Sequence, residues 1–187
     1  MPPFFRPSAT AFFLAVSGAL TLSATPARAA ENSFSIPPQA TTLQGNAIGG
    51  GTVILPGTGS PGFVFSFILP RDYAKNKKIS VVLYLNAADS ACITRIVTTE
   101  LDIIRRGSAI SDDISGVDDG NPNIKIGDKL VSQKVVTIGP GTQLDGQRPG
   151  DAMRLQFRRE PDDDADTCVG SVFVQAIDIR YPIRGTR

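Results

Sequence analysis

The chain has 187 residues, with 19 lysines and arginines against 18 aspartates and glutamates, so its formal charge at neutral pH is +1. A nearly neutral chain has no electrostatic attraction to nucleic acid or anionic lipid, and we expect neither as a partner. The absence of histidine removes the usual general base, the catalytic triads that depend on it and the commonest zinc ligand.

Residues 1–29 predict a secretory signal peptide. Arg6 precedes an apolar run over 11–24, and Ala27-Arg28-Ala29 has the small-residue spacing of a cleavage site, which we place after Ala29. No other stretch approaches the roughly 20 apolar residues of a membrane helix, so we expect no membrane span. Removing 29 of the 187 residues leaves 158, a length that suits one domain. We expect a secreted or periplasmic protein.

Residues 30–62 are rich in glycine, proline and threonine, which predicts an N-terminal arm with one short strand over 52–55. A partly ordered entry loop is the ordinary interpretation of such a segment. The alternative is a self-association segment, with Ile48, Val53 and Ile54 exposed as an apolar patch.

The rest of the chain, residues 63–187, shows the two-residue alternation of strands and no sustained helical repeat. We predict strands over 63–69, 79–85, 92–105, 129–138, 152–159 and 168–181. A turn-rich connection is expected over 106–128, and turns over 139–141 and 148–151. The run over 79–85 is apolar on both faces, which indicates a central strand.

Three of these strands permit face assignments. Over 92–105 we expect Ile93, Val97, Leu101 and Ile103 to share the buried face, with Thr94, Thr98, Glu100 and Asp102 in water. Over 152–159 we expect Met153, Leu155 and Phe157 inside and Arg154, Gln156 and Arg158 outside. In the last strand, Phe173, Ile177, Ile179 and Tyr181 share a face. The pattern predicts an all-β fold, an antiparallel two-sheet β-sandwich of jelly-roll type.

Two cysteines, Cys92 and Cys168, remain after export. An even count in an oxidising compartment predicts one disulfide between them, for which loop-closure entropy gives roughly 4–5 kcal/mol. Two inert buried thiols are the alternative. We do not expect a catalytic thiol, because no histidine is available to activate it.

A sequence order within 63–181 resembles the jelly-roll domains of phage tail-fibre and related virion surface proteins. The matching residues are Gly150-Asp151, Leu155 to Arg158, Asp162 to Thr167 and Ile179 to Tyr181. The signal peptide and the two cysteines depart from that pattern, which favours an exported cellular protein built on the same module. The resemblance implies a homo-oligomer, a trimer by analogy with those domains.

Carboxylates gather at 112–119 and 162–166, where calcium is the conceivable ligand. Neither stretch has the spacing of a defined calcium motif, and neighbouring cations such as Arg158, Arg159 or Lys129 account for them more simply. We therefore predict no metal site and no cofactor.

The main functional prediction is a non-enzymatic structural or surface-interaction module, adhesion-like, whose partner is a cell-surface glycan or protein. The alternative is a carbohydrate-binding module with ligand contacts in or near loops: Tyr73, Asn86, Asp89, Asn121 and Asn123. A glycan hydrolase is the third class, because paired carboxylates suffice for that chemistry. Glu31, Glu100 and Glu160 are the only glutamates beyond the signal peptide, and no pair of them forms a recognisable motif, so we predict no catalytic residues.

Overall fold

The computed structural model describes residues 30–38, 41–44, 47–49, 51–89, 91–104, 123–139 and 147–185, without the side chains of 42–49. The described strands are β1 (Glu31–Ile36), β2 (Thr42–Gln44), β3 (Ala47–Gly49), β4 (Thr52–Leu55), β5 (Gly62–Ile68), β6 (Ile79–Ala87), β7 (Ala91–Ile104), β8 (Asn123–Gly127), β9 (Val131–Ile138), β10 (Ala152–Arg159) and β11 (Val172–Pro182). None of the described residues forms a helix long and apolar enough to cross a membrane. The expected signal peptide, 1–29, lies outside the described residues.

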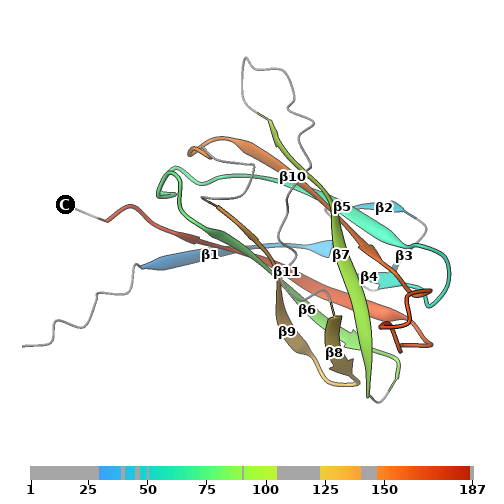
Figure 1. Cartoon of the computed structure of the whole chain (residues 1–187). Coiled ribbons are helices and arrows are strands. Elements are labelled where there is room, and N and C mark those ends of the chain that lie inside the picture. The colour runs from blue at the N-terminus through green and yellow to red at the C-terminus, as the bar shows by residue number, and fades with distance from the viewer. Residues whose placement is uncertain are drawn as a thin grey trace, which may run out of the picture.

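The strands form two antiparallel sheets that face each other, as the sequence predicted (Figure 1). One sheet has the order β3-β4-β11-β6-β9, with β1 also paired to β11, and is called the six-stranded sheet below. The other, the five-stranded sheet, has the order β2-β5-β10-β7-β8. Consecutive strands alternate between the sheets over much of the chain, so the predicted jelly-roll type of sandwich is confirmed.

The core lies between the sheets and is built by the alternation of each strand. Phe63, Phe65 and Phe67 of β5 point inward, and Phe157 of β10 stacks on the first two at centroid distances of 5.5 and 5.8 Å. Leu83 of β6 is among the fully buried residues that face them from the six-stranded sheet. Each such side chain contributes about 1.5–3 kcal/mol by leaving water, which makes this interior the main source of stability.

The expected face assignment of β7 is correct in one half of the strand and wrong in the other. Leu101 and Ile103 are buried as predicted, but Ile93 is exposed and Thr94 is fully buried. The pairing of β7 with β10 shifts register between Gln156 and Phe157, which adds one residue to β7 at this point. Such a bulge reverses the alternation, so the inward set changes from Cys92, Thr94 and Ile96 to Leu101 and Ile103.

The last strand contains a second irregularity. The pairing of β11 with β6 shifts between Val174 and Ala176, so Val172 and Val174 point inward before it and Ile177, Ile179 and Tyr181 after it. Phe173, which was expected on the buried face, is only half-buried and lies opposite Asn86 on the outer side. Further corrections concern Asp102, which is buried rather than in water, and β8, which lies in the stretch expected to be a connection.

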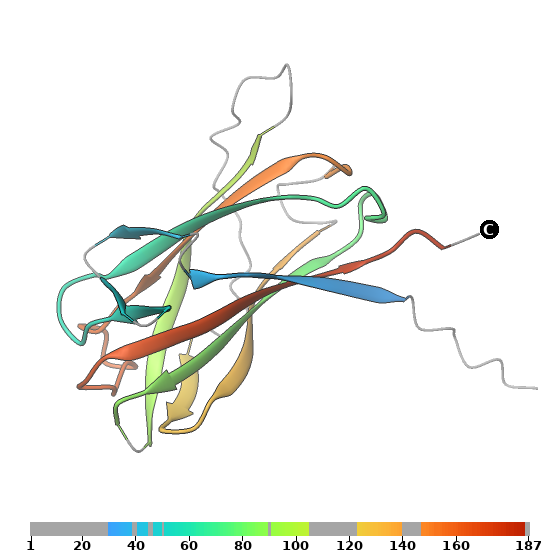
Figure 2. The same ribbon diagram turned by 180° about the vertical axis from the view of Figure 1, so that it is seen from behind.

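Residues 30–62 contribute strands to both sheets, whereas the sequence predicted one. The predicted strand is confirmed as β4, and β1 pairs with the last half of β11, so the first and the last described strands run side by side (Figure 2). Val53 is fully buried, so its expected place in an exposed patch is wrong. The side chain of Ile48 lies outside the described residues, and Ile54 is half-buried on the outer side of β4.

Candidate functional site

Arg159 closes one end of the sandwich as a fully buried charge. It continues the inward series of β10 after Phe157, and its Nε and Nη2 donate to the two carboxylate oxygens of Asp166 at 3.0 and 2.9 Å. Nη1 donates to the carbonyl oxygens of Leu55, Pro56 and Gly170, and Nη2 also donates to that of Cys168. Every nitrogen of the guanidinium is therefore used inside the protein, which makes Arg159 a structural residue.

Asp166 is the matching acceptor. Burial raises the pKa of its carboxyl, but hydrogen bonds from Arg159 and from the backbone N–H of Arg95, with the charge of Arg159, outweigh this and hold the pKa below its ordinary value. The hydroxyl of Thr94 and the N–H of Cys168 also donate to Asp166. The expected relief of the 162–166 carboxylates by a neighbouring cation is thus confirmed for Asp166 and Arg159.

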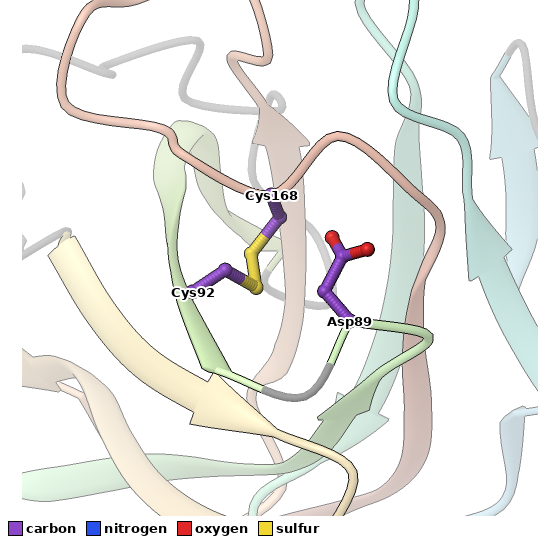
Figure 3. A group of neighbouring side chains, drawn as sticks. All are labelled: Asp89, Cys92 and Cys168. Atoms are coloured by element: carbon purple, nitrogen blue, oxygen red, sulfur yellow. A yellow bond between two sulfur atoms is a disulfide. The ribbon is translucent and has the colours of Figure 1, made fainter.

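The predicted disulfide between Cys92 and Cys168 is present, with the two Cα atoms 5.0 Å apart. Asp89 lies beside it and accepts from the N–H of Gly170 (Figure 3). The ligand atoms of these three residues lie within 4.8 Å of one another, a spacing that a metal ion could use. The two sulfurs are bonded to each other and offer no thiolate, so this group is not a metal site in the oxidised protein.

The turn after β10 carries the other acidic side chains. Glu160 and Asp163 both pair with Arg95, at 2.8 and 3.1 Å, and Glu160 also pairs with Arg158. Burial raises the pKa of Glu160, but hydrogen bonds from Arg95 and Arg158 outweigh it and lower the pKa overall. A general acid of a glycan hydrolase needs a raised pKa, so Glu160 does not suit that role. The 112–119 stretch lies outside the described residues, and the absence of a metal from both stretches stays a prediction.

An open depression of about 320 Å³ lies beside this turn. Its lining is polar and carries both signs of charge: Ser60, Arg158, Glu160, Pro161, Asp162 and Asp163. The Arg158 and Glu160 side chains are bonded to each other across it. Because charges that satisfy each other in water gain little from a further ligand, this depression is a weak candidate for a binding site.

The residues expected to contact a ligand are not brought together. Tyr73 is fully buried; its hydroxyl donates to the carbonyl oxygen of Lys77 and accepts from the N–H of the same residue. Burial raises the pKa of the Tyr73 hydroxyl, and this effect is larger than the lowering by the hydrogen bond with Lys77. The carboxylate of Asp89 accepts a hydrogen bond from the N–H of Gly170, and the side chain of Asn123 accepts one from Arg95 on the five-stranded sheet. Asn121 lies outside the described residues. Of this set Asn86, on β6, faces outward in a polar network.

That network covers the outer face of the six-stranded sheet. The Tyr84 hydroxyl donates to Oδ2 of Asp178 at 3.1 Å and accepts from Nη2 of Arg180 at 3.2 Å, so one phenol links two charged residues of β11. Ser35 of β1 donates to the other carboxylate oxygen of Asp178. Three neighbouring strands therefore fix the positions of these side chains relative to one another.

A second group continues the same face toward β4. Thr52 donates to Oε1 of Gln175 at 2.8 Å, and Nε2 of Gln175 donates to Oδ1 of Asn86 at 2.8 Å. These residues come from β4, β11 and β6, which are adjacent strands. Gln175 lies on the outer side because it directly follows the inward Val174, and the bulge at this point makes Ile177, rather than Ala176, the next inward residue.

The ring of Tyr84 extends along the sheet. The backbone of Tyr84 lies opposite Ala176, whereas its hydroxyl bonds Asp178 and Arg180, which lie opposite Val82 and Ser80. The ring is therefore directed along β6 toward Val82, which points outward and is 4% exposed. An aromatic ring that is half-buried on the outer face of a sheet can pack against a flat ligand.

The outer face of the five-stranded sheet is different. Its centre is an ion-pair cluster, in which Arg154 of β10 pairs with Glu100 and Asp102 of β7 at 3.2 and 3.7 Å. The outward residues of β5 on this face are Val64, Ser66 and Ile68. None of the described outward side chains of β5, β10 and β7 is aromatic, so these three strands offer no aromatic stacking surface.

Sequence reasoning missed Tyr84, Gln175, Asp178 and Arg180. The alternation of β11 contained a signal, since Asp178 and Arg180 occupy the face opposite Ile177 and Ile179. Tyr84 lies in a run that the sequence analysis interpreted as apolar on both faces, and its hydroxyl was the one polar group of its side chain that could have indicated an outward position.

Comparisons with known proteins show no family for this chain. No family model matches the chain, and no curated protein matches it. A xylan-binding domain from Paenibacillus barcinonensis is similar in structure, with a TM-score of 0.41 and 15% identity over 82% of this chain and 95% of that one. A family 11 carbohydrate-binding module from Clostridium thermocellum, in complex with a mixed-linked tetrasaccharide, has a TM-score of 0.35 and 15% identity over 83% and 91%.

Two larger proteins are also similar over part of their length. A mannanase from Podospora anserina has a TM-score of 0.44 and 13% identity over 86% of this chain, and a family two carbohydrate esterase from Cellvibrio japonicus has a TM-score of 0.40 and 7% identity over 84%. The chain spans only 29% and 37% of these two proteins. The arrangement of the two sheets supports the jelly-roll part of the resemblance drawn from the sequence, whereas a relation to phage tail-fibre proteins is not shown.

Proposed function

We propose that the chain is a non-enzymatic glycan-binding domain whose ligand lies on the outer face of the six-stranded sheet. The observation that carries this proposal is the position of Tyr84, whose ring runs along the sheet and is fixed through Asp178 and Arg180. Sugars present apolar C–H faces that pack on aromatic rings and hydroxyls at their rims that need hydrogen-bonding partners. Tyr84 supplies the aromatic ring, and the polar side chains around it supply the hydrogen-bonding partners.

The amide pair of Gln175 and Asn86 supports the same proposal. The two side chains hold each other in place, which lowers the entropy lost when a ligand is bound. This moves the alternative function of the sequence analysis ahead of the general surface-interaction module. The two are related, because a domain that holds a cell-surface glycan is also an adhesion module.

The compartment is part of the proposal. A disulfide that persists in the folded protein suits an oxidising environment, in agreement with the signal peptide expected over 1–29. Glycans of cell surfaces and of extracellular polymers are found there. Self-association, with a trimer as the expected form, is a separate proposal that light scattering tests on the same preparation.

The test is a glycan-binding assay on the full chain, produced with export so that the disulfide forms. We expect a glycan array to identify bound polysaccharides, and calorimetry to give affinities that fall at least tenfold for Tyr84→Ala, since stacking and the fixed hydroxyl are both lost. Tyr84→Phe retains the ring and should lose less.

Arg154→Ala serves as the control, because it changes the centre of the other outer face. It should leave binding unchanged. No binding by the unmodified chain to any glycan would sink the proposal, and so would equal losses for Tyr84→Ala and Arg154→Ala.

A further inference from the structure

The hydrogen-bonding groups on the outer face of the six-stranded sheet are unevenly used. The acceptors of the network around Tyr84 are occupied, since Asp178 accepts from Ser35 and Tyr84, Gln175 accepts from Thr52, and Asn86 accepts from Gln175. The exposed carboxylate of Glu31 lies farther along β1, opposite Pro182. The donors of the network are not used up. Arg180 donates through Nη2 alone, so its Nε and Nη1 have no partner among the described residues.

Other donors on this face are also in excess. The amide of Asn86 has its Nδ2 without a described partner, and the amide of Gln175 uses one of two N–H groups. Lys134 of β9 lies opposite Val82, on the same outer face, and is exposed. A ligand that reaches the network around Tyr84 therefore meets N–H groups and positive charge, and it needs acceptor atoms of its own.

The one carboxylate of the network does not reverse this preference. Both oxygens of Asp178 receive hydrogen bonds, and Nη2 of Arg180 lies 3.9 Å from Oδ2. Hydrogen bonds to a carboxylate delocalise its charge onto the donors, so the negative charge is compensated within the network. The Arg180 side chain remains 43% exposed and can turn its free edge to a ligand.

From these donors we infer that the glycan is acidic, and that an anionic oxygen group on the sugar binds the free edge of Arg180 while the sugar ring packs on Tyr84. A guanidinium presents parallel N–H groups that match the two oxygens of a carboxylate or a sulfate. This inference rests on the proposed glycan-binding function and adds the chemical class of the ligand.

The experiment compares three polymers on the full chain. Oligogalacturonate carries carboxylates, its methyl ester has the same backbone without charge, and a sulfated galactan carries sulfates. We expect at least one of the two acidic glycans to bind tenfold or more tightly than the neutral ester. The preference should shrink in concentrated salt, where screening shortens the range of charge interactions.

Two matched variants locate the preference. Arg180→Gln and Arg154→Gln each remove one positive charge from an outer sheet face, at side chains that are 43% and 42% exposed. Arg180→Gln should lose at least tenfold in affinity for the acidic glycan and keep its melting temperature, while Arg154→Gln should bind like the unmodified chain. The acidic polymer whose affinity falls in Arg180→Gln shows whether Arg180 binds a carboxylate or a sulfate.

Three results would overturn the inference, and they are distinguishable from failure of the proposed function. Equal binding of the acidic and the methyl-esterified glycan, with both lost in Tyr84→Ala, would leave the function standing and remove the acidic preference. Equal losses in the two arginine variants would assign the effect to overall charge. Retention of the acidic preference in Arg180→Gln would exclude the guanidinium. Failure of every glycan to bind would remove the function and the inference together.

Discussion

The protein contains two pairs of arginine and aspartate that differ in burial and in how many of their hydrogen-bonding groups are used. At the closed end of the sandwich, Arg159 and Asp166 are fully buried as side chains and satisfy each other and the carbonyls around them. On the outer face of the six-stranded sheet, Arg180 and Asp178 meet through Tyr84, and the guanidinium keeps donors to spare. The difference teaches that residue type does not decide the role of a charged pair. The number of donors left over and their access to solvent decide it.

The disulfide belongs to the buried end, and its removal should give the largest effect. We expect Cys92→Ala with Cys168→Ala to lower the free energy of unfolding by about 4–5 kcal/mol, because the bond spans 76 residues and its loss releases that loop in the unfolded chain. Urea unfolding measures this, and the unmodified chain with a thiol reductant is the control. A loss below about 1 kcal/mol would contradict the loop-closure account.

The two aspartates allow a direct comparison by the same substitution. Asp166→Ala should cost about 3–4 kcal/mol, since it leaves the Arg159 charge buried without a counter-charge. Asp178→Ala should cost less than about 1 kcal/mol, because its partners can turn to water. Urea unfolding of both variants gives the two values. Similar losses would mean that the two pairs are energetically alike and would break the distinction drawn above.

A second substitution sharpens the first. Adding Arg159→Met to Asp166→Ala removes the unpaired charge and should recover part of the lost stability, as apolar replacements of buried ion pairs often do. No recovery would mean that the guanidinium contributes mainly through its hydrogen bonds to the carbonyls of Leu55, Pro56 and Gly170.

Acid should weaken the buried pair through the pKa of Asp166. The folded protein lowers this pKa below its ordinary value of 3.8, so the carboxylate is favoured in the folded state. The resulting stabilisation is present in full above the unfolded value and is lost as the pH falls through the folded one. Urea unfolding from about pH 6 to about pH 2 should therefore show a fall in the free energy of unfolding below about pH 4.

The variant Asp166→Asn cannot titrate at this position and should show a shallower fall over the same range, from a lower starting stability. Parallel pH profiles of Asp166→Asn and the unmodified chain would show that the acid response originates elsewhere, with Glu160 as the next carboxyl to examine, since its pKa is also lowered.

Two tyrosines give the smallest expected effect and the same contrast. Tyr84→Phe removes a half-exposed hydroxyl and should cost about 0.5–1 kcal/mol at most. Tyr73→Phe removes a hydroxyl that satisfies both backbone groups of Lys77 from a fully buried ring and should cost about 1–3 kcal/mol. Thermal unfolding ranks the two. A larger loss at Tyr84 would show that the outer network is a structural feature rather than a surface prepared for a ligand.

Local pattern was a sufficient guide wherever a strand stayed regular. The strands over 62–68 and 152–159 lie where their alternation predicted, and the inward series from Met153 to Phe157 continues to Arg159 at the same spacing. The inward position of Arg159 was not predicted, because charged side chains are usually expected to stay in water. That expectation failed because Asp166 and four backbone carbonyls lie at that end of the sandwich, and the sequence does not show which carbonyls will meet there.

By itself the sequence determined the fold class, the pairing of Cys92 with Cys168 and the inward faces of the regular strands, because periodicity and cysteine count are local or compositional properties. The tertiary structure decided where the alternation reverses, in β7 and β11, because a bulge depends on how a neighbouring strand pairs. It also decided that Tyr84, Asn86, Gln175, Asp178 and Arg180 share one face. Those residues come from β6 and β11, where the hydrogen-bonded pairs are 89, 94 and 96 residues apart in the sequence and become neighbours only in the sheet.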